Sequence, residues 1–337
     1  MRKRRKAEGG IGVAVVAGGA GFIGSHLCEF LLQRGYRVVC LDNLLTGRLE
    51  NIAHLTTDNG RRKAGNGGRF EFRRVDITNP RAVKNALKHL KKLDVIFNLA
   101  SPASPKDYQA FPLETMRVGS EGTRNLLELA REQGVIFIHT STSEVYGDPK
   151  VHPQTEDYWG NVNPVGVRSV YDEAKRFAEA LVMTYHRLYK IPVRIARIFN
   201  TYGPRMKFDD GRLIPNLIYQ ALNNQPMTIY GTGRQTRSFC YVSDMVLGLY
   251  KLIDCSDPYP INLGNPKEYS VLVCARLIKK LTHSQSRFLF QPLPSDDPKR
   301  RQPDIGRAKR LLNWEPKVSL KEGLIATINW FRGEFSK

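Results

Sequence analysis

The chain of 337 residues has no long hydrophobic run. Its longest apolar stretch, residues 11–17, is far shorter than the ~20 residues that a membrane-spanning helix needs. Residues 1–10 are basic, but no apolar stretch of signal-peptide length follows them. The sequence therefore predicts no membrane span, and we expect a globular, cytoplasmic protein.

The cysteines also lack a pattern, because five are scattered along the chain without a CxxC pair. An odd, unpatterned set in a chain of this length argues against a disulfide framework and against a zinc site. We therefore expect no bound metal, and cysteines that act as small apolar residues in a reducing compartment. They are Cys28, Cys40, Cys240, Cys255 and Cys274.

Acidic residues are few, at 32 against 52 lysines and arginines, which gives a net charge of +20. Nucleic acid, acidic lipid or an anionic small substrate would each suit such a charge. No nucleic-acid-binding motif accompanies it, and the basic residues are not interleaved with aromatic ones. We therefore expect a solvated basic surface and a disordered basic tail over residues 1–10, with neither a membrane nor a nucleic-acid partner.

Short apolar runs alternate with amphipathic stretches from residue 11 to about residue 199. This alternation predicts an α/β fold of the Rossmann type, with a doubly wound parallel sheet. Ligands of such sheets bind at the carboxyl ends of the strands. The predicted strands are residues 12–17, 37–41, 70–75, 95–99, 135–140 and 193–198, and the predicted helices are residues 24–34, 80–91, 112–133 and 169–189.

After residue 199 the pattern becomes irregular and turn signals are frequent, so we expect a second lobe. A nucleotide-binding domain is predicted over residues 11–203 together with about 242–265. A smaller, partly discontinuous C-terminal substrate lobe is predicted over residues 204–241 and 266–337. Residues 57–68, rich in glycine, asparagine and arginine, are interpreted as a surface loop.

A glycine-rich turn lies between the first predicted strand and the first predicted helix. Gly18, Gly21 and Gly24 allow a tight turn, a close backbone approach to a pyrophosphate and close helix–strand packing. The N-terminus of the helix then presents N–H groups to the phosphates. The second predicted strand ends at Asp42, whose carboxylate would accept hydrogen bonds from an adenosine ribose and repel a 2′-phosphate. These features predict NAD, not NADP, as the cofactor.

Tyr171 and Lys175 are four residues apart on a predicted helix, so their side chains lie about 5–6 Å apart on one face. A nearby ammonium group favours the ionised form of a tyrosine, which makes Tyr171 a candidate base for an alcohol proton. Residues 140–147, TSTSEVYG, end a predicted core strand and place hydroxyls and a carboxylate at the ligand edge. A hydroxyl donor, a base and a nicotinamide are the parts that an alcohol-oxidising site needs.

With these motifs the chain resembles the extended short-chain dehydrogenase/reductases, and within them the UDP-glucuronate decarboxylases, also called UDP-xylose synthases. The resemblance runs from about residue 13 to the C-terminus, apart from residues 57–68. It is carried by DNLLTGR at 42–48, NLASPASP at 98–105, TSTSEVYGDP at 140–149, NPVGVRSVYDEAKR at 163–176, ARIFNTYGPRM at 196–206 and DDPKRRQPDI at 296–305.

The resemblance implies three groups of site residues. The catalytic residues are Thr142 (with Ser143 as an alternative), Glu144, Tyr171 and Lys175. The NAD contacts, which include the glycines of the turn, are Gly18, Gly21, Phe22, Ile23, Gly24, Asp42, Asn43, Thr46, Gly47, Asp76, Ile77, Leu99, Ser101, Tyr171, Lys175, Thr201 and Arg212. The substrate contacts are Arg117, Asn200, Arg237 and Arg301 for the diphosphate and glucuronosyl groups, and Tyr230 for the uracil.

Guanidinium groups suit a substrate with about three negative charges, although an arginine can equally form an ordinary surface ion pair. One position departs from the family pattern. Many relatives carry asparagine where this chain has Gly119, which cannot offer an amide to the cofactor and weakens a helix interior. We therefore expect looser cofactor retention without a change of reaction.

The implied reaction is the NAD-dependent decarboxylation of UDP-glucuronate to UDP-xylose. Tyr171 takes the proton of the sugar 4-hydroxyl, the 4-keto group accepts the electrons released with CO₂, and NAD is regenerated within the cycle. Helices 112–133 and 171–189 resemble those through which relatives dimerise, so a homodimer is expected.

Three alternatives remain open. A nucleotide-sugar 4,6-dehydratase would need a carboxylic acid where this chain has Ser143. Residue types alone do not exclude a 4-epimerase, nor do they separate a uridine from a thymidine nucleotide. A non-catalytic NAD- or nucleic-acid-binding protein is the remote alternative.

Overall fold

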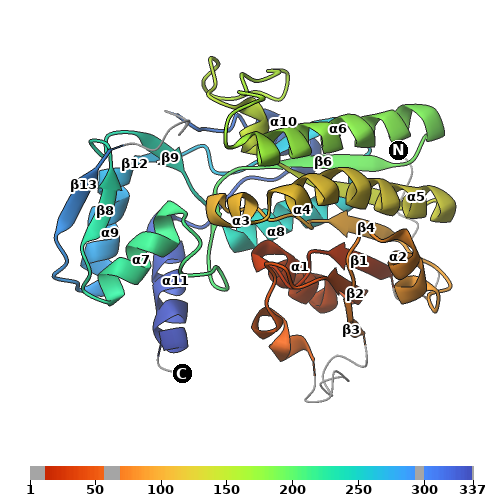
Figure 1. Ribbon diagram of the computed structural model, residues 1–337, viewed down its shortest axis with the longest axis horizontal. Helices are drawn as coiled ribbons and strands as arrows, with labels where there is room; N and C mark the ends of the chain where they lie inside the picture. Colours follow the sequence, from red (N-terminus) through yellow and green to blue (C-terminus); the bar gives the residue numbers. More distant parts are fainter. Residues whose placement is uncertain (1–11, 57–68, 293–299, 336–337) are drawn as a thin grey trace.

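The computed structural model describes residues 12–56, 69–292 and 300–335. The basic tail and the 57–68 loop expected from the sequence lie outside the described residues. A seven-stranded sheet, parallel throughout, forms the centre of the molecule in the order β11-β6-β5-β4-β1-β2-β3 (Figure 1). Its strands are β1 (Val13–Ala17), β2 (Arg37–Asp42), β3 (Phe70–Arg74), β4 (Val95–Asn98), β5 (Ile136–Thr142), β6 (Val193–Ile198) and β11 (Pro260–Leu263). The predicted Rossmann-type fold is confirmed.

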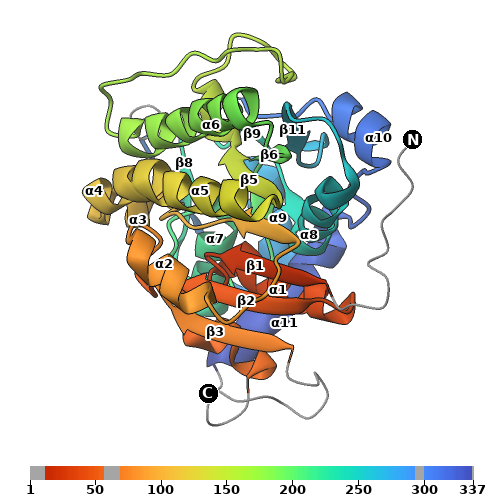
Figure 2. The same cartoon turned by 90° about the vertical axis from the view of Figure 1, so that its right-hand side faces the viewer.

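Both faces of the sheet are buried because alternate residues of each strand point to opposite sides. In β1, Ala14 and Val16 belong to one hydrophobic cluster, whereas Val15 and Ala17 belong to another. Figure 2 shows the two helical layers that cover these faces. One layer contains α1 (Phe22–Gln33), α8 (Val242–Lys251) and α10 (Gly306–Leu312), and the other contains α2 (Pro80–Leu87), α5 (Thr123–Gln133) and α6 (Ser169–Tyr189).

The predicted helix over residues 112–133 is interrupted, which corrects the prediction of one continuous helix. It consists of α4 (Pro112–Arg117), a π-helical turn (Val118–Gly122) and then α5. Gly119 lies in the wide turn, where a Cβ atom would stand only 2.9 Å from Cβ of Ala174 on α6. Glycine therefore lets the backbone of this turn pack closely against α6, and does not simply weaken a helix interior.

A second hydrophobic core lies beside the carboxyl ends of the sheet strands and combines the middle of the chain with its C-terminal part (Figure 1). Apolar residues of three helices pack there on a two-stranded parallel ribbon of β8 and β13. Its elements are α7 (Leu213–Leu222), β8 (Met227–Tyr230), α9 (Val271–Thr282), β13 (Phe288–Gln291) and α11 (Leu320–Phe335). Two small ribbons connect this lobe to the rest, β7 (Thr201–Tyr202) with β10 (Cys240–Tyr241) and β9 (Thr236–Ser238) with β12 (Glu268–Ser270).

The cysteines are free and buried in this fold. In the described part of the chain, no helix combines the length and apolarity needed to cross a bilayer. No group of three or more histidine, cysteine, aspartate or glutamate side chains is arranged to hold a metal within residues 12–56, 69–292 and 300–335.

Candidate active site

A cavity of about 780 Å³ opens at the carboxyl ends of the sheet strands and extends to the smaller lobe. Strand ends form its floor because parallel strands all finish at the same edge of the sheet. Every residue that the sequence predicts for cofactor, substrate or catalysis lines this one cavity. The structure therefore brings the whole predicted set together, and the role of each residue stays a prediction.

The glycine turn forms one end of the cavity. Gly18 has a φ of +78°, and a Cβ atom there would lie 2.7 Å from the amide nitrogen of Ala100, so only glycine fits. Among the described residues, no side chain caps the N-terminus of α1 at Gly21, and the first helical turn has no acidic residue. Its N–H groups are therefore available to an anion such as a pyrophosphate.

Asp42 ends β2 beside this turn and is almost fully buried. Its Oδ2 accepts a hydrogen bond from the Ala20 amide at 3.0 Å, and its Oδ1 accepts one from the Leu44 amide at 2.9 Å. Burial raises the pKa of Asp42, although these two hydrogen bonds oppose the shift. Each carboxylate oxygen keeps a second lone pair for a ribose hydroxyl. The turn, the helix terminus and this fixed carboxylate fit NAD.

The reactive end of the cavity contains Tyr171 on α6. Its ring stacks on Tyr108 of α3 (Pro105–Ala110) with centroids 5.2 Å apart, and its hydroxyl is hydrogen-bonded to the side chain of Thr142. Burial raises the Tyr171 pKa above its usual range, and the Thr142 hydrogen bond and the positive charge of Arg212 act in the opposite direction. Sequence reasoning found the tyrosine and the threonine but missed the stacked Tyr108.

Lys175 lies one helical turn after Tyr171, with Nζ 5.8 Å from the centroid of the tyrosine ring. It donates a hydrogen bond to the carbonyl oxygen of Thr140 at 2.9 Å. Burial lowers the pKa of Lys175 to about 8. The two side chains share a helix face as the spacing predicts, but Thr142 and Arg212 are the groups that lower the tyrosine pKa.

Glu144 is held between two guanidinium groups, because it forms ion pairs with both Arg168 and Arg301. Burial raises the Glu144 pKa, but the charges of Arg301 and then Arg168 outweigh it and leave the pKa below its usual range. Glu144 therefore stays ionised at neutral pH. Arg168 was missed in the sequence, although it stands three residues before Tyr171 and so shares its side of α6.

Arg301 makes further contacts with the same loop and is only 3% exposed. Its Nη1 donates to Oγ of Ser143 at 3.2 Å, and its Nη2 donates to the Gly147 carbonyl oxygen at 3.0 Å. The structure thus separates the two hydroxyls that the sequence left as alternatives. Thr142 contacts Tyr171, whereas Ser143 contacts Arg301.

Other predicted arginines also have protein partners. Arg212 forms a two-pronged pair with Asp210, at 2.6 Å from Nε and 2.5 Å from Nη2. Arg117 pairs with Glu121 at 3.4 Å. Its positive charge also acts on Asp76, which is one of the predicted cofactor contacts. Each would have to share or exchange its partner to bind a ligand, so these assignments stay predictions.

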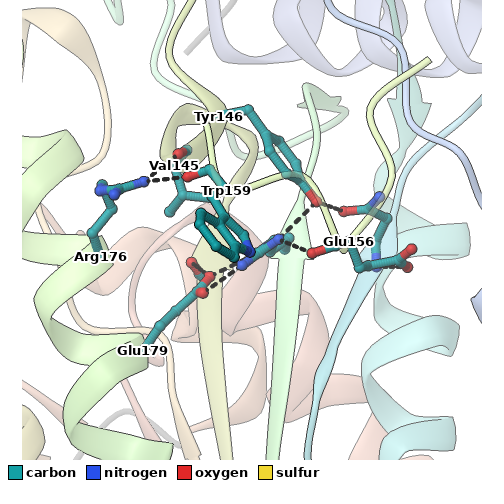
Figure 3. A network of polar contacts seen from close by, with 9 residues as sticks. Val145, Tyr146, Glu156, Trp159, Arg176 and Glu179 are labelled. Atoms are coloured by element: carbon teal, nitrogen blue, oxygen red, sulfur yellow. Dashed lines mark hydrogen bonds and ion pairs between the residues drawn. The ribbon is translucent and has the colours of Figure 1, made fainter. Parts of the chain in front are cut away.

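A network of polar contacts supports the loop that carries Glu144 (Figure 3). Arg176 of α6 donates to the carbonyl oxygens of Val145 and Trp159, at 3.0 and 2.8 Å. Arg197 of β6 binds both carboxylate oxygens of Glu179, at 2.9 and 2.8 Å. These contacts tie the loop to rigid elements, so Glu144 has a fixed position relative to Tyr171.

Comparison with known proteins agrees with this geometry. The family model described as GDP-mannose 4,6 dehydratase matches residues 15–327. UDP-glucuronic acid decarboxylase 1 from Arabidopsis thaliana is 50% identical over 318 residues, covering 94% of this chain and 69% of that protein. The chain belongs to the UDP-glucuronic acid decarboxylases, within the extended short-chain dehydrogenase/reductases. The Xenopus tropicalis UDP-glucuronic acid decarboxylase 1 is 47% identical over 320 residues, covering 95% of this chain and 72% of that protein.

Solved structures share the same fold. UDP-glucuronic acid 4-epimerase from Bacillus cereus, in complex with UDP-glucuronic acid and NAD, superposes with a TM-score of 0.81 at 31% identity, covering 96% of this chain and 99% of that one. UDP-glucose 4-epimerase from Thermotoga maritima, with UDP-glucose, gives a TM-score of 0.86 at 28% identity, with the same coverage. Proteins with this architecture therefore catalyse different reactions, and the local chemistry of the cavity has to separate them.

Proposed function

We propose that this protein converts UDP-glucuronate to UDP-xylose and CO₂, with NAD as a cofactor that is regenerated in each turnover. The observation that carries this proposal is the reactive end of the cavity. A buried tyrosine is hydrogen-bonded to Thr142 there, beside a glutamate that two arginines keep ionised. The sequence identity of 50% to a UDP-glucuronic acid decarboxylase, over 94% of this chain, supports the same reaction.

In this proposal Tyr171 accepts the proton of the sugar 4-hydroxyl, and Thr142 holds the reacting oxygen by a hydrogen bond. Because burial keeps the Tyr171 pKa high, its activation depends on the Thr142 hydrogen bond and on the charge of Arg212. When bound, NAD would supply the acceptor for the C4 hydrogen, which leaves as a hydride, and would return the same hydride in the reduction that ends the cycle. The glycine turn, the α1 N-terminus and Asp42 would hold the pyrophosphate and the adenosine ribose of that cofactor at the opposite end of the cavity.

The 4-keto group formed in this way is β to the C5 carboxylate, so it can accept the electron pair released with CO₂ as an enolate. A proton then adds to C5, and reduction of the 4-keto group completes the cycle. A 4,6-dehydratase would instead have to expel a 6-hydroxyl with the help of a carboxylic acid. Ser143 is too weak an acid for that role, and Glu144 is held as a carboxylate. The site therefore favours decarboxylation over dehydration.

The test is to incubate the protein with UDP-glucuronate and NAD and to identify the product by mass spectrometry and chromatography. A UDP-pentose, lighter than the substrate by one CO₂, supports the proposal. A product of unchanged mass that elutes as the 4-epimer would make the protein an epimerase, as in the Bacillus cereus neighbour. The absence of any product in the presence of tight NAD binding would leave a binding protein.

We also propose a homodimer in a reducing, cytoplasmic compartment. Leu113 and Met116 of α4 and Phe177 of α6 are exposed apolar side chains on the outer helical layer, at 69, 48 and 53% exposure. A second copy of the chain would remove them from water. Free, buried cysteines suit a reducing compartment. Light scattering after size-exclusion chromatography tests the dimer, and a monomeric mass would contradict it.

A further inference from the structure

Four buried or half-buried charges meet beside Tyr171. They come from three parts of the chain, and three of them line the cavity while the fourth lies behind them. The lining residues are Glu144, Arg168 and Arg301, and the residue behind them is Asp172, which is 5% exposed. No role was assigned to Asp172 from the sequence.

The two carboxylates of this cluster are paired very unequally. Glu144 forms ion pairs with both arginines. Asp172 reaches only Nε of Arg168, at 4.0 Å, and its buried Oδ1 has no hydrogen-bond partner among the described residues. An unpaired buried carboxylate oxygen is costly when it is charged, so Asp172 is the member of the cluster that most readily binds a proton.

The surroundings of Asp172 point in the same direction. Burial and the charge of Glu144 raise its pKa to about 7, although Arg168 and Arg301 oppose the shift. The titratable and charged groups that face it are Tyr171 and Glu173 on its own helix, Arg168 at the N-cap of that helix, Glu144 from η5 (Ser143–Tyr146) and Arg301 from the C-terminal segment. A small change of charge nearby therefore changes its protonation near neutral pH.

The net charge of the cluster depends on this one proton. With both carboxylates ionised, the two arginines are neutralised and the cluster is uncharged. When Asp172 binds a proton, the cluster carries one positive charge on the cavity side. A substrate carboxylate on C5 would lie close to it, because C5 is bonded to the carbon whose hydroxyl Tyr171 deprotonates. Arg168 at the N-cap of α6 and Asp172 within α6 stand on either side of Tyr171 in the sequence.

We propose that Asp172 is a specificity-determining positioning residue, which takes up a proton when an acidic sugar binds and so makes the cavity wall positive for its carboxylate. This inference rests on the proposed function, since it assumes a substrate with a C5 carboxylate. A sugar with a neutral C5 substituent induces no uptake, because it adds no negative charge beside the cluster.

Proton uptake can be measured directly by calorimetric titration in buffers of different ionisation enthalpy. The Tyr171→Phe variant, loaded with NAD, prevents turnover during the titration. At pH 7.5 we expect UDP-glucuronate to bind with uptake of on the order of half a proton, as the linkage between binding and protonation requires. UDP-glucose should bind with uptake close to zero. Equal uptake for the two sugars would overturn the inference.

A matched variant assigns the proton to Asp172. Asp172→Asn, in the same Tyr171→Phe background, keeps the shape and removes the titration. As the pH rises from 6.5 to 8.5, the affinity for UDP-glucuronate should fall roughly sixfold more in the protein that contains Asp172 than in the Asp172→Asn variant, which corresponds to about one pKa unit of coupling. Lys175 titrates in the same range in both proteins, so the comparison removes its contribution.

A third variant and a binding control separate the possible failures. Asp172→Glu keeps a titratable group and should restore part of the pH dependence, which a purely structural role would not. If Asp172→Asn has the same uptake and pH dependence as its parent, Asp172 is not the group. If Asp172→Asn fails to fold, the Asp172→Glu variant decides the inference, because a change in its proton uptake relative to its parent assigns the proton to this position and separates it from Lys175. If UDP-glucuronate fails to bind to any of these proteins, the proposed function itself is wrong.

Discussion

The two ends of the cavity are built in different ways. The cofactor end uses backbone groups and one carboxylate from the first strand–helix–strand unit, with Gly18 and Asp42 close in sequence. The reactive end brings together side chains from distant segments, so that Glu144 and Arg301 are in contact although they are 157 residues apart. The first arrangement is local and largely independent of the rest of the chain, whereas the second exists only in the folded protein.

The electrostatics of the two ends differ as well. At the cofactor end, N–H groups and a helix terminus meet the ligand, and these partial charges need no partner of their own. At the reactive end, full charges are buried, and those of Glu144, Arg168 and Arg301 are tolerated because they are paired with one another. Substitutions at the reactive end should therefore have the larger effects.

The largest effect is expected for Tyr171→Phe, which removes the proton acceptor and keeps the stacked ring. Turnover should fall by about 10²–10⁴-fold, the usual contribution of general base catalysis, while NAD affinity is retained. Steady-state kinetics and NAD titration check both parts. A folded variant with near-normal turnover would show that the base is elsewhere and that the reactive end is misassigned.

Arg301→Lys should have the next largest effect, because lysine keeps the charge but cannot reach Glu144, Ser143 and Gly147 together. Loss of hydrogen bonds to a charged group costs about 1.5–3 kcal/mol, which predicts a fall of roughly 10- to 150-fold in kcat/KM for UDP-glucuronate.

The control for this prediction is its sequence neighbour. Arg300 is exposed, so Arg300→Lys should leave kcat/KM nearly unchanged. NAD affinity of the Arg301→Lys variant should stay within a factor of about two, because the substitution is at the other end of the cavity. Equal losses in both variants would mean that the whole basic segment acts together.

At the cofactor end, calorimetric titration should show NAD binding at least about tenfold tighter than NADP, because Asp42 repels a 2′-phosphate. Asp42→Asn keeps an oxygen acceptor and removes the charge, so it should narrow this difference. Equal affinities for NAD and NADP in the unmodified protein would show that Asp42 does not determine the choice of cofactor.

The smallest effect is expected for a substitution at the contact between α1 and the segment that leads into the smaller lobe. Glu29 of α1 is hydrogen-bonded to His54 at 3.1 Å and ion-paired with Arg205, in the segment that leads into the smaller lobe. The hydrogen bond from His54, together with Arg205, lowers the Glu29 pKa to about 2 although burial opposes this. The ionised Glu29 therefore stabilises the folded state fully at a pH above its unfolded-state pKa. This contribution is lost as the pH falls through about 2.

Glu29→Gln should lower Tm by about 1–2 °C at pH 7, a modest value because the pair is partly exposed. The difference from the unmodified protein should shrink as the pH is lowered from 5 towards 2. Thermal melts followed by circular dichroism provide the comparison. A constant difference across this range would show that the Glu29 charge does not contribute.

The contrast between the two ends also explains what the sequence could reveal. The strands, most helices and the glycine turn follow from local periodicity and from Gly18, Gly21 and Gly24. The π-helical turn at Gly119 could not be predicted, since it depends on close packing against Ala174.

At the reactive end, Tyr171 and Lys175 were visible because they share a helix face. The sequence did not reveal the contacts of Glu144 with Arg168 and Arg301. It also did not reveal that Tyr108 stacks on Tyr171, or that Asp172 has a buried oxygen without a hydrogen-bond partner among the described residues. These features depend on how distant segments pack, and no local pattern encodes such distances.

The most direct test of the proposed reaction follows the hydrogen at C4 of the substrate. UDP-glucuronate with deuterium at C4 and ¹³C in the carboxyl group is incubated with the protein and NAD. The proposed reaction yields ¹³CO₂ and a UDP-pentose that keeps the deuterium at C4, because the same cofactor removes and returns it. A product that retains the labelled carboxyl group, or a pentose that has lost the deuterium, would contradict it.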